Sequence, residues 1–435
     1  MNSLLIRNAR IARPDGATID GDVLCEAGRI ARIAPAITAR ASETIDAQGM
    51  LLLPGIIDPQ VHFREPGKEY KEDLASGSHA AVAGGVTSFL EMPNTDPSTT
   101  TQAALDDKLQ RAAAKSVANY GFFIGATPHN LEEINRATPA CGIKIFMGAS
   151  TGSLLVDKPQ DLERIFANGT RLIAVHAEDE VRIRARKAQF AGRTDYPVHS
   201  EIRDAECALN ATKLAMSLSK KYKRRLHILH LSTKEEANFL REDKPAWVTA
   251  EVIPNHLFLN IKDYSTQGSR VQMNPPIRTA EDNALLWQTL RDGVIDFVAT
   301  DHAPHTLEEK SKPYPDSPSG MPGVEISLPL MLTEMVAGRC TLAEIQRWMC
   351  WGPAVGYGIA NKGKILEGWD ADLTLVDVAT RKLVRDENTF TKVRWSPYSG
   401  RELTGWPVYT VVNGEIAFEH GRVRDKVRGR PLQFG

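Results

Sequence analysis

Two histidines end apolar segments of the sequence, at positions where they could bind a metal ion. His176 ends LIAVH and His230 ends HILH, and neutral imidazole is a common ligand of zinc. One histidine in an apolar strand is often a packed core residue, but two at neighbouring strand ends favour a metal site. His227 precedes His230 by three positions. The two side chains should therefore point to opposite faces of a strand, and we expect His227 to face a helix.

Lys144 lies inside the apolar segment GIKIFM. Burying an unpaired ammonium group is costly, so an ordinary lysine here would extend to the surface or pair with an acid. A buried amine that has lost its proton can instead react with carbon dioxide, and the resulting carbamate can bridge two metal ions. We therefore expect a carboxylated Lys144, or an unmodified lysine paired with Asp301 if one of the metals is missing.

Asp301 follows the apolar segment VIDFVAT and opens the motif DHAPH. A carboxylate at this position could simply cap a helix or a loop. Next to a metal it could act as a ligand and as a general base that takes a proton from water and passes it to a departing nitrogen. His305, four residues later, could donate a hydrogen bond to a substrate or lie on the surface.

Eight short segments with strand character must position these residues, and helical patterns separate several of them. Eight strands that alternate with helices over about 300 residues predict an α/β fold, a (β/α)8 barrel formed by residues 54–356. In such a barrel the chemistry takes place at the carboxyl ends of the strands. An open doubly wound sheet is the alternative, but REPGKEYKED follows the first segment where a glycine-rich loop would be expected. The segments are 56–62, 86–92, 119–125, 142–147, 171–176, 226–231, 247–253 and 294–300.

The two ends of the chain have a different pattern, with short β-leaning runs separated by Asp-Gly and Gly-Asp turns. Neither residues 1–53 nor residues 357–435 should bury a stable core alone, because small all-β fragments are marginal. We therefore expect both ends to combine into one small composite β-sandwich domain.

Composition and charge exclude several functional classes. Lys+Arg 53 against Asp+Glu 54 gives a net charge of -1, so no global basic field would attract nucleic acid or an anionic membrane. We expect no transmembrane helix, because no run of 18 apolar residues occurs, and no signal peptide, because arginines interrupt the first apolar run. Five scattered cysteines without a C-x-x-C pair are typical of a cytoplasmic enzyme with reduced thiols.

Seven motifs resemble those of the amidohydrolase superfamily, and within it most closely the dihydroorotase family. The similarity extends over nearly the whole chain. It implies a zinc-dependent enzyme, a homodimer, that reversibly cyclises N-carbamoyl-L-aspartate to L-dihydroorotate in de novo pyrimidine (UMP) biosynthesis. A metal-activated hydroxide would attack the cyclic amide in the reverse direction, with Asp301 as general base and acid. In order, the motifs are PGIIDPQVHFREPG, EMPNTDPST, GIKIFMGAS, VHAEDE, LHLST, MNPPIR and TDHAPH.

The same resemblance implies roles for individual residues. His176 and His230 would hold one metal, carboxylated Lys144 would bridge to a second, and Asp301 would touch that second metal. His62 would belong to the metal motif of the first strand. The substrate would be bound by a further group, which consists of His62, Arg64, Asn94, Asn274, His305 and the backbone of Pro322 and Gly323.

Gln60 departs from the family pattern. The first motif is usually His-x-His, whereas this chain has Gln60-Val61-His62. The carbonyl oxygen of glutamine is a weaker ligand for zinc than imidazole, so Gln60 is a doubtful ligand. We expect one tightly bound zinc and a second site that is partly occupied or empty.

Arg64 favours dihydroorotate as the substrate, because a guanidinium group can bind a carboxylate with two hydrogen bonds. A surface salt bridge with Glu65 or Glu69 is the competing interpretation of Arg64. Two other functions stay open. The first is a hydantoinase-, dihydropyrimidinase- or allantoinase-like enzyme that opens neutral rings. The second is a catalytically silent subunit that scaffolds aspartate transcarbamoylase, which Gln60 would permit.

The segment HTLEEKSKPYPDSPSGMPG follows the last predicted strand and is rich in proline, serine and glycine. This composition fits either a loop that becomes ordered when substrate binds or a long surface loop.

Overall fold

A closed barrel of parallel strands forms the centre of the protein in the computed structural model, which describes residues 3–149 and 154–435. Every predicted strand segment except the third contains one barrel strand. The third contains two, β8 and β9, which are separated at Phe123. Ser150 of the motif GIKIFMGAS lies outside the described residues. The strands are β6 (Ile56–Val61), β7 (Val86–Glu91), β8 (Asn119–Phe122), β9 (Ile124–Gly125), β10 (Ile143–Phe146), β11 (Ile173–His176), β12 (Leu226–Ile228), β13 (Val248–Val252) and β14 (Phe297–Val298).

Backbone pairing closes these strands into a ring. β6, β7 and β8 form one parallel sheet, and β9 to β14 form a second in chain order. Val61 and His302 form a parallel bridge, and the N–H of His62 donates to the carbonyl of His302 at 2.7 Å. The first strand therefore meets the end of the last, which confirms the (β/α)8 barrel and excludes an open doubly wound sheet.

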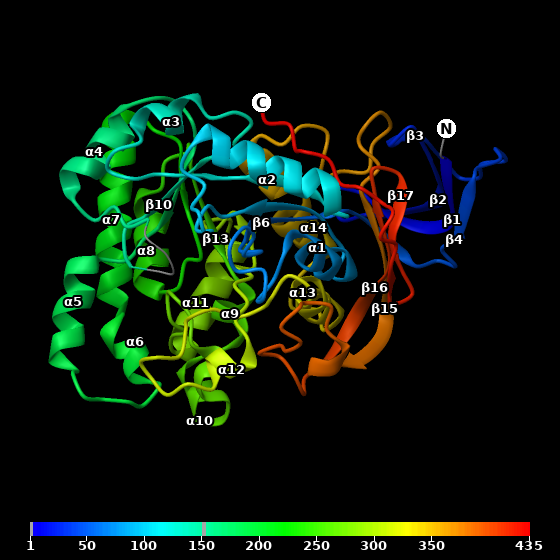
Figure 1. Cartoon of the computed structure of the whole chain (residues 1–435). Helices are drawn as coiled ribbons and strands as arrows, with labels where there is room; N and C mark the ends of the chain where they lie inside the picture. Colours follow the sequence, from blue (N-terminus) through cyan, green and yellow to red (C-terminus); the bar gives the residue numbers. More distant parts are fainter. Residues whose placement is uncertain (1–2, 150–153) are drawn as a thin grey trace.

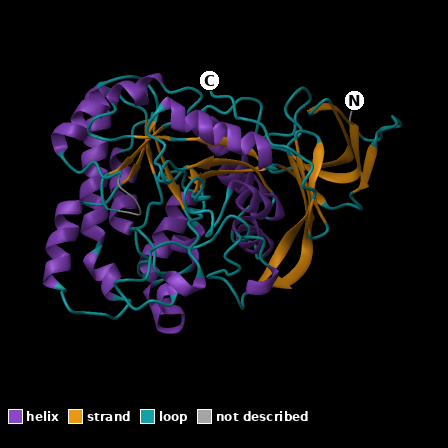
Figure 2. Cartoon of the chain, in the orientation of Figure 1, coloured by secondary structure: helices purple, strands orange, loops and turns teal. Residues whose placement is uncertain are grey.

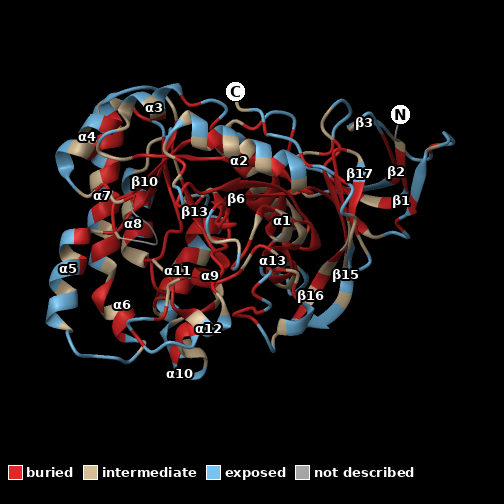
Figure 3. Cartoon of the chain, viewed as in Figure 1, coloured by how far each residue is buried: buried red, intermediate tan, exposed pale blue. Residues whose placement is uncertain are grey.

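Helices surround the barrel strands on the outside (Figure 2), and nearly every residue of the barrel strands is buried (Figure 3). Burial on both faces explains why the strand segments are continuously apolar rather than alternating. Side-chain caps fix several helix starts, such as Asp73 with Ser76 at α1 and Thr233 with Glu236 at α8. The helices are α1 (Leu74–Ala83), α2 (Gln102–Lys115), α3 (Leu131–Arg136), α4 (Pro159–Ala167), α5 (Glu180–Gln189), α6 (Val198–Ile202), α7 (Ala205–Tyr222), α8 (Lys234–Asp243), α9 (Pro254–Phe258), α10 (Tyr264–Gln267), α11 (Ala280–Arg291), α12 (Leu307–Lys310), α13 (Ser327–Val336), α14 (Leu342–Gln346) and α15 (Gly352–Tyr357).

Strands from both ends of the chain share one nine-stranded mixed sheet beside the barrel (Figure 1). β5 joins the two ends, because it pairs with β1 in parallel and with β15 antiparallel. The β-domain is therefore composite, whereas its boundaries at residues 53 and 357 stay predictions. Its strands are β1 (Ser3–Ala12), β2 (Thr18–Glu26), β3 (Arg29–Ala34), β4 (Glu43–Asp46), β5 (Leu51–Pro54), β15 (Leu373–Leu383), β16 (Glu402–Val412), β17 (Glu415–Glu419) and β18 (Arg422–Val423).

The last residues of the chain return to the barrel. Tyr120 of β8 accepts the N–H of Leu432 at 2.8 Å and donates its own N–H to the carbonyl of Arg430 at 3.1 Å. Leu432 is buried in a cluster with residues of the barrel strands, such as Leu90 and Ala174. The tail thus contributes to the closure of the barrel. Among the described helices, none combines the length and apolar character needed to cross a bilayer.

Candidate active site

One pocket at the carboxyl ends of the barrel strands brings together every residue predicted as a metal ligand. Its empty volume is about 340 Å³. The chain segments that line it come from strands far apart in sequence, as expected for the functional end of a barrel. The lining residues are Gln60, His62, Lys144, Phe146, His176, His230, Asn274, Asp301, Ala303, Ser319 and Gly320.

On one side of the pocket, the side chains of Gln60 and His62 meet at Asp301. The amide nitrogen of Gln60 donates to Asp301 Oδ1 at 3.0 Å, and His62 Nε2 lies 3.0 Å from the same oxygen. His62 Nδ1 lies 2.7 Å from Asn94 Oδ1, and burial lowers the pKa of His62. Because Nδ1 of a neutral imidazole would donate to Asn94, Nε2 faces Asp301 as an acceptor. Two acceptor atoms at this separation can share a cation.

On the opposite side, His176 and His230 form a second pair. His176 Nδ1 lies 3.0 Å from His230 Nε2, and His176 Nε2 lies 2.9 Å from Glu178 Oε2. The Glu178 carboxylate orients the imidazole by accepting its Nε2 proton, so the lone pair of Nδ1 points to His230. Metal-binding histidines commonly have such a carboxylate partner. Burial also lowers the pKa of both histidines, which keeps them neutral.

Lys144 is buried and lines the same pocket as both pairs. Its Nζ lies 4.5 Å from the centre of the Phe146 ring, so the side chain does not extend to the surface. Burial lowers the pKa of the Lys144 amine to about 7, against the opposite effect of the Asp301 and Glu251 carboxylates. A substantial fraction of this amine is neutral near pH 7, which is the form that reacts with carbon dioxide.

Three site residues have left-handed backbone conformations: Arg64 at φ 66°, His230 at φ 37° and Asp301 at φ 48°. Positive φ is uncommon for residues other than glycine and concentrates at functional sites. Each of the three follows a barrel strand by two or three residues. The backbone therefore turns at each of these residues just beyond its strand.

The structure places the predicted substrate-binding residues both in the pocket and around it. Asn274 lines the pocket, and its Oδ1 lies 2.9 Å from His199 Nε2. Arg64 is buried beside the pocket, where its Nε donates to the carbonyl of Pro304 at 3.2 Å and its Nη2 lies 3.3 Å from His305 Nε2. The competing surface bridge is not seen among the described residues, because Glu65 pairs with Lys115 at 2.7 Å. Glu69 instead accepts the N–H of Gly67.

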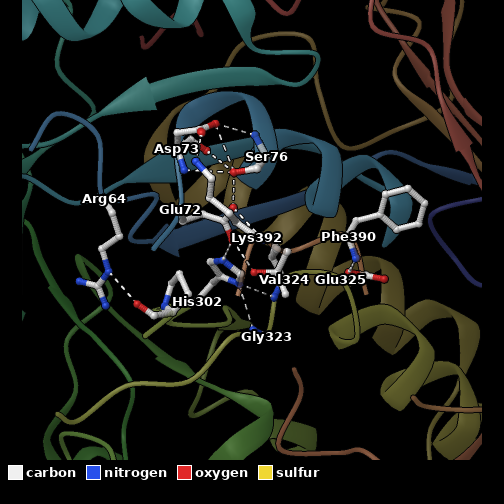
Figure 4. A network of polar contacts seen from close by, with 12 residues as sticks. Arg64, Glu72, Asp73, Ser76, His302, Gly323, Val324, Glu325, Phe390 and Lys392 are labelled. Atoms are coloured by element: carbon white, nitrogen blue, oxygen red, sulfur yellow. Dashed lines mark hydrogen bonds and ion pairs between the residues drawn. The ribbon is translucent and has the colours of Figure 1, made fainter. Parts of the chain in front are cut away.

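Pro322 and Gly323 lie behind the pocket, next to His302. The N–H groups of Gly323 and Val324 approach His302 Nδ1 at 3.0 and 3.3 Å, and His302 Nε2 lies 3.4 Å from the buried Glu72 carboxylate (Figure 4). This network connects the strand end that carries Asp301 with the segment before α1. Sequence reasoning missed both Glu72 and His302, although His302 lies within the quoted motif TDHAPH.

His227 contacts a helix as well as barrel strands, because its ring centroid lies 5.3 Å from that of Tyr357 in α15. Its ring stacks on Phe297 of β14 at a centroid distance of 4.9 Å, and its Nε2 lies 3.0 Å from Glu251 of β13. The rule of alternating faces does not extend to His230, because β12 ends at Ile228 and the backbone then turns at His230, where φ is positive. Both histidines therefore face partners on neighbouring strands.

The side chains in the pocket are suited to bind a metal ion, and their donor atoms are arranged in two separate pairs. Within residues 3–149 and 154–435, no three His, Cys, Asp or Glu side chains converge on one point. Each pair nevertheless has two donor atoms 3.0 Å apart, which is compatible with two bonds of about 2.0–2.2 Å to one zinc ion. His230 Nδ1 and Gln60 Oε1 are buried without a hydrogen-bond partner. A ligand from Lys144, which lines the same pocket, would complete a site.

Comparison with known proteins agrees with this geometry. The model of the amidohydrolase family matches residues 51–417. The chain is 35% identical to a protein of Methanosarcina mazei named dihydroorotase, over 100% of this chain and 98% of the relative. A protein of the same name from Pyrococcus horikoshii is 34% identical, over 95% of this chain and 92% of the relative.

Solved structures show the same architecture. The L-hydantoinase (dihydropyrimidinase) of Arthrobacter aurescens superimposes with a TM-score of 0.94 at 31% identity, covering 99% of this chain and 100% of that one. The dihydropyrimidinase of Brevibacillus agri gives a TM-score of 0.90 at 25% identity, covering 98% and 97%. Enzymes of this type are generally metal-dependent and hydrolyse cyclic amides. The chain therefore belongs to the amidohydrolase family.

Proposed function

We propose that the protein is a dihydroorotase that interconverts N-carbamoyl-L-aspartate and L-dihydroorotate in pyrimidine biosynthesis. Full-length similarity to proteins named dihydroorotase supports this assignment. The structural observation that carries it is the buried guanidinium of Arg64 beside the pocket, next to His305. Dihydroorotate carries a carboxylate that a neutral cyclic amide lacks, and a fixed guanidinium is the group best suited to bind it.

In this proposal Asp301 transfers the proton. Its Oδ1 accepts a hydrogen bond from the Gln60 amide at 3.0 Å, which holds the carboxylate in one orientation at the pocket wall. It would take a proton from the attacking water and deliver it to the ring nitrogen that leaves. The same transfers in reverse order serve the cyclisation.

The metal site belongs to the same proposal. His176, His230 and Lys144 as a carbamate would hold a zinc ion, with His62, Asp301 and weakly Gln60 around a second position. Bound there, zinc would polarise the amide carbonyl and acidify a water molecule. We also place the enzyme in the cytoplasm as a homodimer, as the resemblance of the whole chain to its family implies.

A hydantoinase or dihydropyrimidinase activity is the second candidate, because the L-hydantoinase structure superimposes so closely. A panel of dihydroorotate, hydantoin, dihydrouracil and allantoin separates the two. We expect kcat/KM for dihydroorotate to exceed that for each neutral ring by at least about a hundredfold, since one buried charge pair distinguishes the substrates. Faster opening of a neutral ring would reject the dihydroorotase assignment. No opening of any ring by zinc-loaded protein would instead favour the silent subunit.

Gln60 leads to a prediction about metal content. We expect about one zinc per chain after exhaustive dialysis against a chelator, because glutamine binds zinc more weakly than histidine does. The variant Gln60→His should retain nearly two, and metal analysis by mass spectrometry measures both. Glu235→Gln, on the outer helix α8, is the matched control and should behave like the wild type. Two full equivalents in dialysed wild-type protein would contradict the prediction.

A further inference from the structure

Lys310 is a buried lysine that the proposed reaction does not use. It ends the short helix α12, nine residues after Asp301, and its side chain is 1% exposed. Its Nζ donates to three backbone carbonyls, those of Gln272 at 3.1 Å, Pro318 at 2.8 Å and Gly320 at 3.1 Å. Three carbonyl acceptors satisfy all three N–H groups of one ammonium.

The three carbonyls belong to two separate segments that line the pocket. Gln272 lies two residues before Asn274, and Pro318 and Gly320 flank Ser319. Asn274, Ser319 and Gly320 all contribute to the pocket wall. One ammonium group therefore joins two sides of the pocket rim.

Further hydrogen bonds connect the same two segments. Gly320 N–H donates to the Gln272 carbonyl at 2.9 Å. The Gln272 side chain donates to the carbonyl of Ser317 at 2.8 Å and accepts from its hydroxyl at 2.7 Å. In this structure hydrogen bonds therefore join the segment after the last strand to the segment that precedes Asn274.

The position of Lys310 is costly for stability. Burial lowers the pKa of its amine to about 7, and the nearby Glu309 only partly offsets this effect. Glu309 itself pairs with Lys71 at 2.8 Å. Backbone carbonyl dipoles rather than an acid therefore carry most of the stabilisation of this charge. A neutral apolar side chain would avoid the desolvation cost. Packing alone therefore does not explain why a charged residue occupies position 310.

We propose that Lys310 is a positioning residue for substrate binding, and that its ammonium holds segments 272–274 and 317–320 at the spacing that fits the cyclic amide ring. This inference rests on the proposed function for the nature of the ring. It does not depend on whether dihydroorotate or a neutral ring is the better substrate, because both present a planar cyclic amide to the same wall.

The test compares Lys310→Met with Lys362→Met. Lys362 is a second buried lysine, and it pairs with Asp370 at 3.1 Å and with Asp372, away from the pocket. For Lys310→Met we expect KM for the best ring of the panel to rise about tenfold while kcat stays within about twofold, because the wall binds ground state and transition state alike. For Lys362→Met we expect a lower melting temperature with unchanged KM.

Hydrogen exchange supplies a readout that does not need turnover. The Gly320 amide should exchange at least about tenfold faster in Lys310→Met than in the wild type, because the hydrogen bonds from Lys310 that hold its segment are lost. Lys362→Met should leave this amide unchanged. If Lys310→Met does not fold, Lys310→Gln replaces it, since a shorter amide can still donate to part of the carbonyl set and should give a smaller rise in KM.

Two results would overturn the inference. The first is an unchanged KM together with unchanged Gly320 exchange in the Lys310 variant. The second is an equal rise in KM in Lys362→Met, which would show that any loss of stability affects the pocket. If the wild type opens no ring of the panel, the proposed function fails, whereas the exchange measurement still decides whether Lys310 holds the wall.

Discussion

Replacing Asp301 by asparagine should lower kcat for dihydroorotate opening by about a thousandfold, the usual range for loss of a general acid and base. Asparagine has the same shape and can still accept the hydrogen bond from Gln60, which Asp301 Oδ1 receives at 3.0 Å. It cannot take a proton. We therefore expect KM to change little, because the substitution removes an interaction of the transition state and leaves substrate binding. Steady-state kinetics with zinc-loaded protein measure both constants.

Asp296→Asn is the matched control for this variant. Asp296 lies five residues earlier on the same chain segment and pairs with Lys244 at 2.7 Å at the outer side of the barrel. It should retain kcat within about twofold, as expected for a partly exposed ion pair of small energetic value. If Asp301→Asn kept more than about a tenth of the wild-type kcat, Asp301 would not be the proton-transfer group.

Arg64→Ala should lower kcat/KM for dihydroorotate by about a thousandfold, which corresponds to removing one partner of a buried charge pair. The guanidinium is buried, and contacts with Pro304 and His305 hold it in place, so its orientation is set before a carboxylate arrives. Turnover of hydantoin, which has no carboxylate, should fall far less. Zinc content should stay the same, because Arg64 is not among the expected ligands.

Two further variants sharpen this experiment. Arg64→Lys keeps the charge but loses the fork geometry, so it should recover only part of the lost kcat/KM. Arg241→Ala removes an arginine of α8 that pairs with Asp292 at 3.0 Å on the surface, and should behave like the wild type. If Arg64→Ala lowered kcat/KM equally for dihydroorotate and hydantoin, Arg64 would not be the group that binds the substrate carboxylate. Its role would then be structural.

The barrel and the pocket could be predicted because their signals are local. Each strand segment is a short apolar run, and the polar residue lies at or just after its carboxyl end, as with His176, the last residue of β11. The barrel then brings these ends together without further information. A period-two pattern alone does not place His227, because β12 stops after three residues and the ring contacts residues of β13, β14 and α15.

The supporting residues could not be predicted, because their partners come from loops that sequence patterns do not place. Glu178 lies two residues after His176 and was visible in the motif VHAEDE, but only the fold shows that it contacts the imidazole. Glu72, His302 and Lys310 depend on contacts between segments tens to hundreds of residues apart. The hydrophobic periodicity of a sequence carries no information about contacts between segments that far apart along the chain.

The paired positions of β5 and the carboxyl-terminal tail have a consequence for synthesis of the protein. β5 can complete its pairing only after β15 has left the ribosome, and Tyr120 of the third strand segment receives its tail partners only from residues 430–432. A nascent chain therefore keeps this edge of a nearly finished barrel unpaired until residues 430–432 have been synthesised. A chain that lacks residues 430–432 would leave the backbone of Tyr120 without these partners, although all of its pocket residues would be present.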